Sequence, residues 1–169
     1  MNNKFLIDSN SFISPYRQFY ACDIVHSYWK ELSKHIEKKE IVLLDMVRSE
    51  LEEGGDALLD WISKRDFEIC NHATKEVIDN YGTVMSYVKN CGYYNDKGFN
   101  SWAQIEVADP WLIAAAMAYG YTIVTFEIGS GNLNVKVKMG RVKIPDVATH
   151  FDVECVDLYE MMRRLKISL

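Results

Sequence analysis

The sequence predicts an α/β protein, a three-layer α/β/α sandwich whose central sheet is mainly parallel. Three short apolar runs carry this prediction, at 4–7 (KFLI), 41–44 (IVLL) and 121–125 (YTIVT), and stretches with helical periodicity separate them. Continuous apolar strands are typical of parallel sheets that are covered on both faces. Parallel neighbours require crossover helices, so we expect the carboxyl ends of these strands to share one edge of the sheet.

The composition is that of one folded domain. With 169 residues, 49% hydrophobic and 12% aromatic, the chain can bury a full core, and we expect a single domain over 1–169. A net charge of -5 argues against a general polyanion binder, so a nucleic-acid contact requires a basic patch or a metal ion. The cysteines lack metal-binding spacing, and neither a signal peptide nor an apolar run of ~18 residues is present. We expect a reduced, cytoplasmic protein without a membrane partner.

The first strand ends at Asp8, which Ser9, Asn10 and Ser11 follow. Taken alone, this stretch favours a strand-to-helix turn with capping side chains over a sheet-edge carboxylate held by polar neighbours. An amphipathic helix is expected at 22–39, with Ile24 in its apolar stripe and a lysine-rich outer face that reads as solvated surface.

After the strand at 41–44, Asp45 has the position of a helix N-cap, and Gly54 and Gly55 close that helix. Glu50 lies on its inner side beside Val47, where a carboxylate is costly unless it is paired or bound to a metal.

The middle of the chain is predicted to be mostly helical. Asp56 is expected to cap a short helix at 57–64, residues 67–70 are extended or a link, and 74–90 form a helix. We expect 91–101 to be a surface loop. The loop aromatics could stack on nucleic-acid bases, but packing against the nearest helix is favoured; they are Tyr93, Tyr94 and Phe99.

The stretch 108–127 reads as a helix that leads into a buried strand. Asp109 precedes Pro110 at the helix start, Gly120 ends the helix, and Glu127 follows the strand. An isolated Asp-Pro pair favours a helix cap. A chemical role for Asp109 therefore depends on other acids reaching the same edge, where ligands bind in open α/β sheets.

The C-terminal part begins with a flexible loop at 129–131 and an alternating basic stretch at 133–142. Two interpretations of this stretch stand equally, an edge strand protected by lysines and a contact for a phosphate backbone. The basic residues concerned are Lys136, Lys138, Arg141 and Lys143. A short helix starting near 143–146, a last strand at 153–156 and a closing helix at 158–166 complete the chain.

Four acids thus lie at or beside the predicted sheet edge; they are Asp8, Glu50, Asp109 and Glu127. Crowded carboxylates repel and raise one another's pKa unless a cation neutralises them. Hard oxygen ligands suit Mg²⁺ or Mn²⁺, which can activate water and stabilise the leaving oxygen of a phosphodiester. The four histidines are dispersed, and the sequence contains no Walker loop or GxGxxG motif.

These motifs in order resemble the PIN-domain family, and more narrowly the PIN-like group named DUF4411. The motifs are DSN at Asp8, VRSEL at Glu50, DPWLIAAAMA at Asp109, and IVTFE at Thr125 and Glu127. The resemblance covers nearly the whole chain, including the closing KIPDV segment. It implies a metal-dependent endoribonuclease, often the toxin of a toxin–antitoxin pair. Its partners would be RNA and an antitoxin, and the helices at 22–39 and 74–90 are candidate homodimer surfaces.

The resemblance also implies residue roles. The acids that would hold Mg²⁺ or Mn²⁺ are Asp8, Glu50 and Asp109, with Asn10 and Thr125 as supporting polar groups. Glu127 matches a fourth acidic catalytic position where PIN domains more commonly carry Asp, and its longer side chain would act through water or bind only a second ion. A non-catalytic module that binds RNA or protein is the alternative, but it would have no need for four mutually repelling acids. A metal-dependent phosphatase is a weaker alternative, because position 10 is Asn and the nucleophile motif DxD is missing.

Overall fold

The computed structural model describes residues 4–54 and 57–169, and within them five strands form one sheet. The strand order is β3-β2-β1-β4-β5, and every neighbouring pair is parallel. The strands are β1 (Phe5–Ile7), β2 (Ile41–Leu44), β3 (Glu68–Cys70), β4 (Thr122–Val124) and β5 (Cys155–Val156). The predicted three-layer α/β/α fold with a mainly parallel sheet is confirmed.

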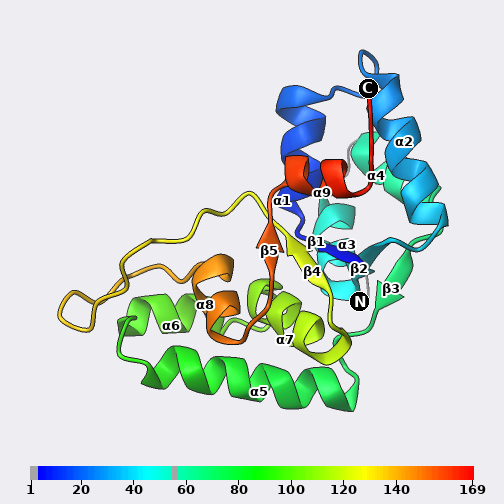
Figure 1. The fold of residues 1–169 in the computed structure, drawn as a ribbon. Helices are drawn as coiled ribbons and strands as arrows, with labels where there is room; N and C mark the ends of the chain where they lie inside the picture. The colour runs from blue at the N-terminus through cyan, green and yellow to red at the C-terminus, as the bar shows by residue number, and fades with distance from the viewer. Residues whose placement is uncertain (1–3, 55–56) are drawn as a thin grey trace.

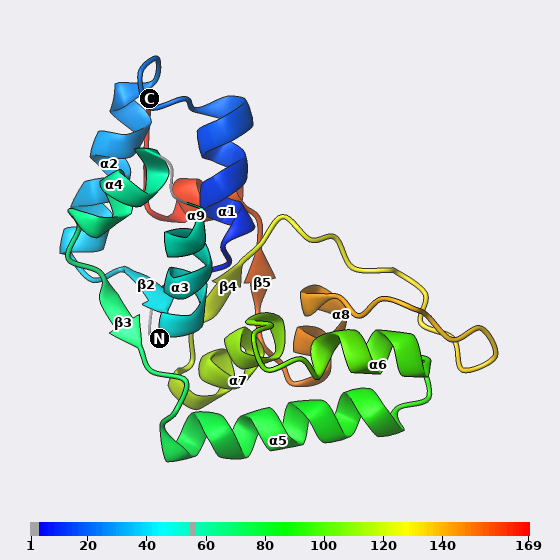
Figure 2. The same cartoon turned by 180° about the vertical axis from the view of Figure 1, so that it is seen from behind.

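Helices cover both faces of this sheet. The described segments before β4 are α1 (Asn10–Ser14), a π-helical turn η1 (Pro15–Phe19), α2 (His26–Glu37), α3 (Asp45–Glu53), α4 (Ala57–Ser63), α5 (Lys75–Asn90), α6 (Asp96–Trp102) and α7 (Asp109–Tyr119). Those after β4 are α8 (Ile144–His150) and α9 (Leu158–Arg164). Figures 1 and 2 show α5, α6, α7 and α8 on one side of the sheet, and α1, α2, α4 and α9 on the other.

The connections explain this division. The chain moves from β1 outward to β2 and β3 with α1–α4 as crossovers, then returns through α5–α7 to β4 on the other side of β1. Right-handed crossovers running in opposite directions place their helices on opposite faces. The chain therefore diverges between β1 and β4, and the carboxyl ends of these two strands border the crevice where α/β sheets bind ligands.

The core lies where the apolar runs predicted it. All residues of β1 and β2 are buried, as are Ile123 and Val124 of β4. The helix α7 is buried along much of its length, and Gly120 ends it in the left-handed conformation at φ 68°. A residue with a Cβ atom is strained there, which explains why glycine terminates the helix. No helix of the described chain is long and apolar enough to cross a bilayer.

Several predicted elements need correction in the first half of the chain. The helix predicted at 22–39 begins only at His26, and Ile24 is 76% exposed rather than part of the apolar stripe. The segment 67–70, left open as extended or a link, contains the edge strand β3. Gly54 follows α3 as predicted, while Gly55 and the cap predicted at Asp56 lie outside the described residues.

The surface loop predicted at 91–101 is wrong, because α6 occupies much of it. The Asn95 side chain caps α6 by accepting a hydrogen bond from the Gly98 N–H at 3.0 Å, and Trp102 is buried at its end. Tyr94 is 5% exposed, and Tyr93 and Phe99 pack against the core, which confirms the favoured packing interpretation. A local cap and buried aromatic rings stabilise a helix that the glycine-containing sequence does not signal.

The basic stretch at 133–142 is not an edge strand. Its one described β contact is an isolated parallel bridge between Tyr94 and Met139. The alternation of Val135 and Val137 with lysines therefore does not reflect a buried face, because these valines are 59% and 72% exposed. Figures 1 and 2 show this segment as a long loop that projects beyond α6 and α8.

The two helices predicted as dimer surfaces turn their apolar faces inward. The buried residues of α2 are Tyr28, Trp29, Leu32, His35 and Ile36, and those of α5 are Val77, Val84 and Val88. α5 lies along α7 in both views. These faces stabilise the monomer, and a homodimer stays a prediction.

Candidate carboxylate site at the sheet edge

The sheet register places Asp8 and Thr125 side by side at the divergence of β1 and β4. Ile7 pairs with Val124, so the next residue of each strand reaches the carboxyl edge together. The Thr125 hydroxyl donates a hydrogen bond to Asp8 Oδ2 at 3.1 Å, and the Ser9 hydroxyl lies 3.4 Å from Asp8 Oδ1. Ser9, the residue before α1, makes no side-chain cap. The predicted strand-to-helix turn is present between β1 and α1, but the predicted side-chain cap is not made by Ser9.

Asp8 is a buried carboxyl group, 4% exposed. Burial raises its pKa to about 6, and repulsion from Glu127 and Glu50 adds to the rise. The Thr125 hydrogen bond acts in the opposite direction because it favours the ionised form. Asp8 therefore carries a marked electrostatic cost when it is charged in the folded protein.

Asp109 approaches Asp8 from the start of α7, on the side of the sheet that α5, α6 and α8 also cover. It is the first residue of α7, where Pro110 fits because its missing N–H would lack a helical partner anyway. Burial raises the pKa of Asp109 to about 7, followed by repulsion from the other acids; these are Asp8, Glu127 and Glu50. A hydrogen bond from the Trp102 side chain partly opposes this rise. The N-cap position of α7 is held by Ala108, which has no capping side chain, and Asp109 is already inside the helix. The cap role that an isolated Asp-Pro pair suggests for Asp109 is therefore wrong.

Glu50 comes from the inner side of α3, as predicted. Burial raises its pKa, while hydrogen bonds from the Ser9 hydroxyl and the Ala108 backbone N–H act against the rise. Ser9 therefore interacts with both Asp8 and Glu50, and Ala108 joins Glu50 to the residue before Asp109. Three acids from β1, α3 and α7 thus meet at one edge and repel one another.

The donor set fits a hard divalent cation. These acids supply carboxylate oxygens, which are ligands that such a cation prefers. Their pKa values are shifted by burial, by the other carboxylates and by hydrogen bonds from uncharged donors. Across residues 4–54 and 57–169, however, no three His, Cys, Asp or Glu side chains form a ready-made metal cage. Binding of one ion by Asp8, Glu50 and Asp109 stays a prediction.

Glu127 differs from the other three acids because one of its described partners is a cation, Arg141. Oε1 accepts a hydrogen bond from Arg141 Nη2 at 2.8 Å, and Oε2 accepts one from the Ile144 N–H at 2.8 Å. Its own N–H donates to Thr125 Oγ1 at 3.1 Å. Glu127 is therefore close enough to repel Asp8 and Asp109 but is itself balanced by an arginine.

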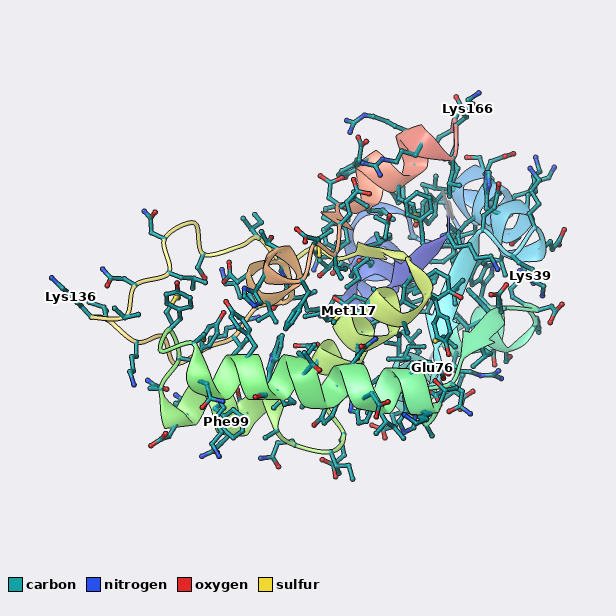
Figure 3. The ribbon with its side chains drawn as sticks, turned by 60° about the horizontal axis from the view of Figure 1, so that its bottom comes forward. Lys39, Glu76, Phe99, Met117, Lys136 and Lys166 are labelled. Carbon is teal, nitrogen blue, oxygen red and sulfur yellow. The ribbon has the colours of Figure 1, made fainter. Side chains whose placement is uncertain are left out.

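The remaining predicted site residues separate into two groups. Arg141 and Lys143 line a hollow of about 360 Å³ together with Asp8, Asn10 and Glu127. Asn10 is exposed, and in the described structure its side chain makes no hydrogen bond to Asp8. Lys136 and Lys138 lie on the projecting loop away from these acids, and Figure 3 shows Lys136 at the outer end of that loop.

Three contacts of the site had no clear signal in the sequence. They are the Trp102 hydrogen bond to Asp109, the Arg141–Glu127 ion pair, and the pairing of Asp45 with His72. The expected N-cap role of Asp45 is wrong, because Asp45 is already the first residue of α3. Its carboxylate lies 2.8 Å from His72 Nδ1 and also accepts a hydrogen bond from the His72 N–H. It thereby ties the start of α3 to the segment after β3.

Fold and site together define an α/β protein with clustered carboxylates at the carboxyl edge of a parallel sheet. The chain matches the family described as Domain of unknown function (DUF4411) over residues 5–169, and it belongs to that family. Its structure is similar to a chain in the crystal structure of VapBC2 from Rickettsia felis bound to a DNA fragment from their promoter. The TM-score is 0.56 at 15% identity, over 90% of this chain and 97% of that chain, so the likeness concerns the fold. No curated protein matches the sequence.

Proposed function

We propose that this protein is a divalent-metal-dependent endoribonuclease. The observation that carries the proposal is the convergence of Asp8, Glu50 and Asp109 where β1 and β4 diverge, with all three pKa values raised. Buried carboxylates that repel one another destabilise the folded protein unless a bound cation neutralises them. Groups with strongly shifted pKa values cluster at functional sites, so this arrangement indicates a functional site.

In this proposal Asp8, Glu50 and Asp109 hold Mg²⁺ or Mn²⁺. When bound, the ion would stabilise negative charge on the phosphate and lower the pKa of the attacking water. Since the carboxylates do not form a ready-made cage, we expect their side chains to reorient on binding. Thr125 and Trp102 act on Asp8 and Asp109 through hydrogen bonds, which restricts where these carboxylates point.

The reaction would be hydrolysis of a phosphodiester. The water oxygen forms a bond to phosphorus, the bond from phosphorus to the leaving sugar oxygen breaks, and that oxygen takes up a proton. The products are one chain end with a phosphate and one with a hydroxyl group. We further propose that a partner protein of the antitoxin kind restrains this activity, as in the PIN-domain toxins that the motifs resemble.

The test is cleavage of a mixed RNA pool, and separately of single-stranded DNA, by the purified protein with Mn²⁺ and with EDTA. We expect Mn²⁺-dependent cleavage of RNA that falls by roughly 100-fold or more in Asp8→Asn and Asp109→Asn. Asp66→Asn is the matched control, because Asp66 is an exposed acid that pairs with Lys39 away from the sheet edge. Cleavage that survives both site substitutions would contradict the site, and RNA binding without cleavage would support the non-catalytic alternative.

A further inference from the structure

The carboxylate of Glu127 and the basic loop form one connected structure. Arg141 donates to one carboxylate oxygen, and the backbone N–H at the start of α8 donates to the other. The exposed fraction of the Glu127 side chain is 16%, whereas that of the Arg141 side chain is 74%. Glu127 is thus the enclosed partner of the pair, and Arg141 faces solvent.

The loop that carries Arg141 is fastened at both ends. The backbone N–H and the hydroxyl of Ser130 both donate to the Asp146 carboxylate of α8 at 2.7 Å. Ser130, in the middle of the stretch 129–131, is thus bound to α8 by two hydrogen bonds. At the other end, the Met139 N–H donates to the Tyr93 carbonyl at 2.8 Å, and the Asn95 N–H donates to the Met139 carbonyl at 3.0 Å.

These anchors place two cations at one hollow. Arg141 and Lys143 line it together with Asp8 and Glu127, while Lys136 stands at the outer end of the loop (Figure 3). The Lys143 ammonium is itself held by a hydrogen bond to the Ile128 carbonyl at 2.7 Å. A guanidinium has five N–H donors, and Arg141 uses one of them in the hydrogen bond to Glu127. Donors on both residues are therefore left for a ligand.

We propose that Glu127 is a positioning residue rather than a metal ligand, and that it holds Arg141 where Arg141 and Lys143 bind a phosphate of the nucleic-acid chain. This inference rests on the proposed function, because the phosphate belongs to the same substrate. A phosphate in the hollow would meet cations on the loop side and the acid cluster on the sheet side. A guanidinium suits this task, since it binds phosphate oxygens through paired N–H groups.

A metal-ligand role for Glu127 would place a cation beside oxygens that already accept hydrogen bonds from the Arg141 guanidinium and the Ile144 N–H, and the guanidinium would repel that cation. Its longer side chain instead reaches the loop and the first turn of α8 at the same time. The Glu127 N–H also donates to Thr125, which in turn donates to Asp8. The positions of Arg141 and of the first-strand acid are therefore set by one chain of hydrogen bonds.

The experiment measures metal and RNA binding separately. Mn²⁺ affinity is measured by calorimetry, and affinity for a labelled single-stranded RNA is measured by fluorescence anisotropy in EDTA over a range of salt concentrations. We expect Glu127→Gln to change the Mn²⁺ dissociation constant less than about threefold, whereas Asp109→Asn weakens it by roughly 10- to 100-fold. Arg141→Gln should weaken RNA binding about tenfold and reduce the salt slope by about one.

A double mutant tests the coupling between the two residues. Because Glu127 acts through Arg141, the variant with both Glu127→Gln and Arg141→Gln should bind RNA no more weakly than Arg141→Gln alone. Arg163→Gln is the matched control, since Arg163 is an exposed arginine 3.6 Å from Glu160 on α9, and its RNA affinity should match the wild type.

Three results would overturn the inference. These are loss of Mn²⁺ affinity in Glu127→Gln as large as in Asp109→Asn, additive effects in the double mutant, and RNA affinity that Arg141→Gln leaves unchanged. Loss of cleavage in all forms, with intact RNA binding that depends on Arg141, would instead refute the nuclease proposal alone. Absence of RNA binding by the wild-type protein would refute the phosphate contact.

Discussion

Asp109 shows at the scale of a residue why this site is costly for the folded protein. Its pKa rises from 3.8 to about 7, chiefly through burial and then through the neighbouring acids. Between these two values the folded state binds more protons than the unfolded state, so the free energy of unfolding falls as the pH rises through that window. Asp8, with a pKa of about 6, acts in the same direction.

We therefore predict that Asp109→Asn stabilises the metal-free protein at pH 8. Removing the buried charge should raise the free energy of unfolding by on the order of 2–4 kcal/mol, because each unit of pKa shift corresponds to about 1.4 kcal/mol. At pH 4 the two proteins should differ little. Urea unfolding in EDTA at both pH values provides the measurement, with Asp66→Asn as the control. An Asp109→Asn protein less stable than the wild type at pH 8 would refute this electrostatic account.

How far the sequence predicts the site depends on what each residue contacts. Asp8 and Thr125 were predictable, because each follows a buried strand and parallel neighbours end at the same edge. The pairing of Glu127 with Arg141 was not, since it spans fourteen residues of loop without periodicity. Asp45 was misassigned because its partner His72 lies 27 residues away, after another strand.

At the scale of the elements, α6 links the middle of the chain to the basic loop. A Cβ atom at Gly98 would lie 3.0 Å from the Met139 carbonyl oxygen, which is closer than ordinary van der Waals contact. The glycine thus allows the helix and the loop backbone to approach each other. The same backbone segment, 139–141, leads directly to the arginine that pairs with Glu127.

Gly98→Ala should therefore displace the loop and weaken RNA binding by roughly three- to tenfold, while Mn²⁺ affinity stays unchanged. Overpacking of this kind also lowers stability, typically by about 1–3 kcal/mol. Gly82→Ala is a matched control in α5, because a Cβ atom there meets nothing within 4 Å and should stabilise the helix by roughly 0.5–1 kcal/mol. Unchanged RNA affinity in Gly98→Ala would show that the contact between α6 and the loop does not position Arg141.

Helices with a regular spacing of apolar residues could be predicted from the sequence, whereas a short helix without that spacing could not. The long helices α5 and α7 have regular apolar spacing, and the sequence placed both to within a residue or two. The short α6 depends on an asparagine cap and on the burial of Trp102, so local propensity alone indicated a loop. The stretch 133–142 has the alternation of a strand, but in the part of the chain that the structure describes its only β contact is the bridge from Met139 to Tyr94, and in the fold it is a loop.

At the scale of the whole molecule, charge and topology act together. The chain has a net charge of -5, and three of the acids included in that charge meet where β1 and β4 diverge. A polyanionic substrate would be repelled from that point without a bound cation or local basic groups. The topology places Arg141 and Lys143 beside the acids, because the loop after β4 passes over the carboxyl edge before it enters α8.

The most direct test of a metal site formed by Asp8, Glu50 and Asp109 is anomalous diffraction from a crystal soaked in Mn²⁺. We predict an anomalous peak coordinated by these three carboxylates, with Glu127 still bound to Arg141 and to the Ile144 N–H. A crystal soaked in Mn²⁺ that shows no peak among the three carboxylates, or a peak bound elsewhere, would contradict the account.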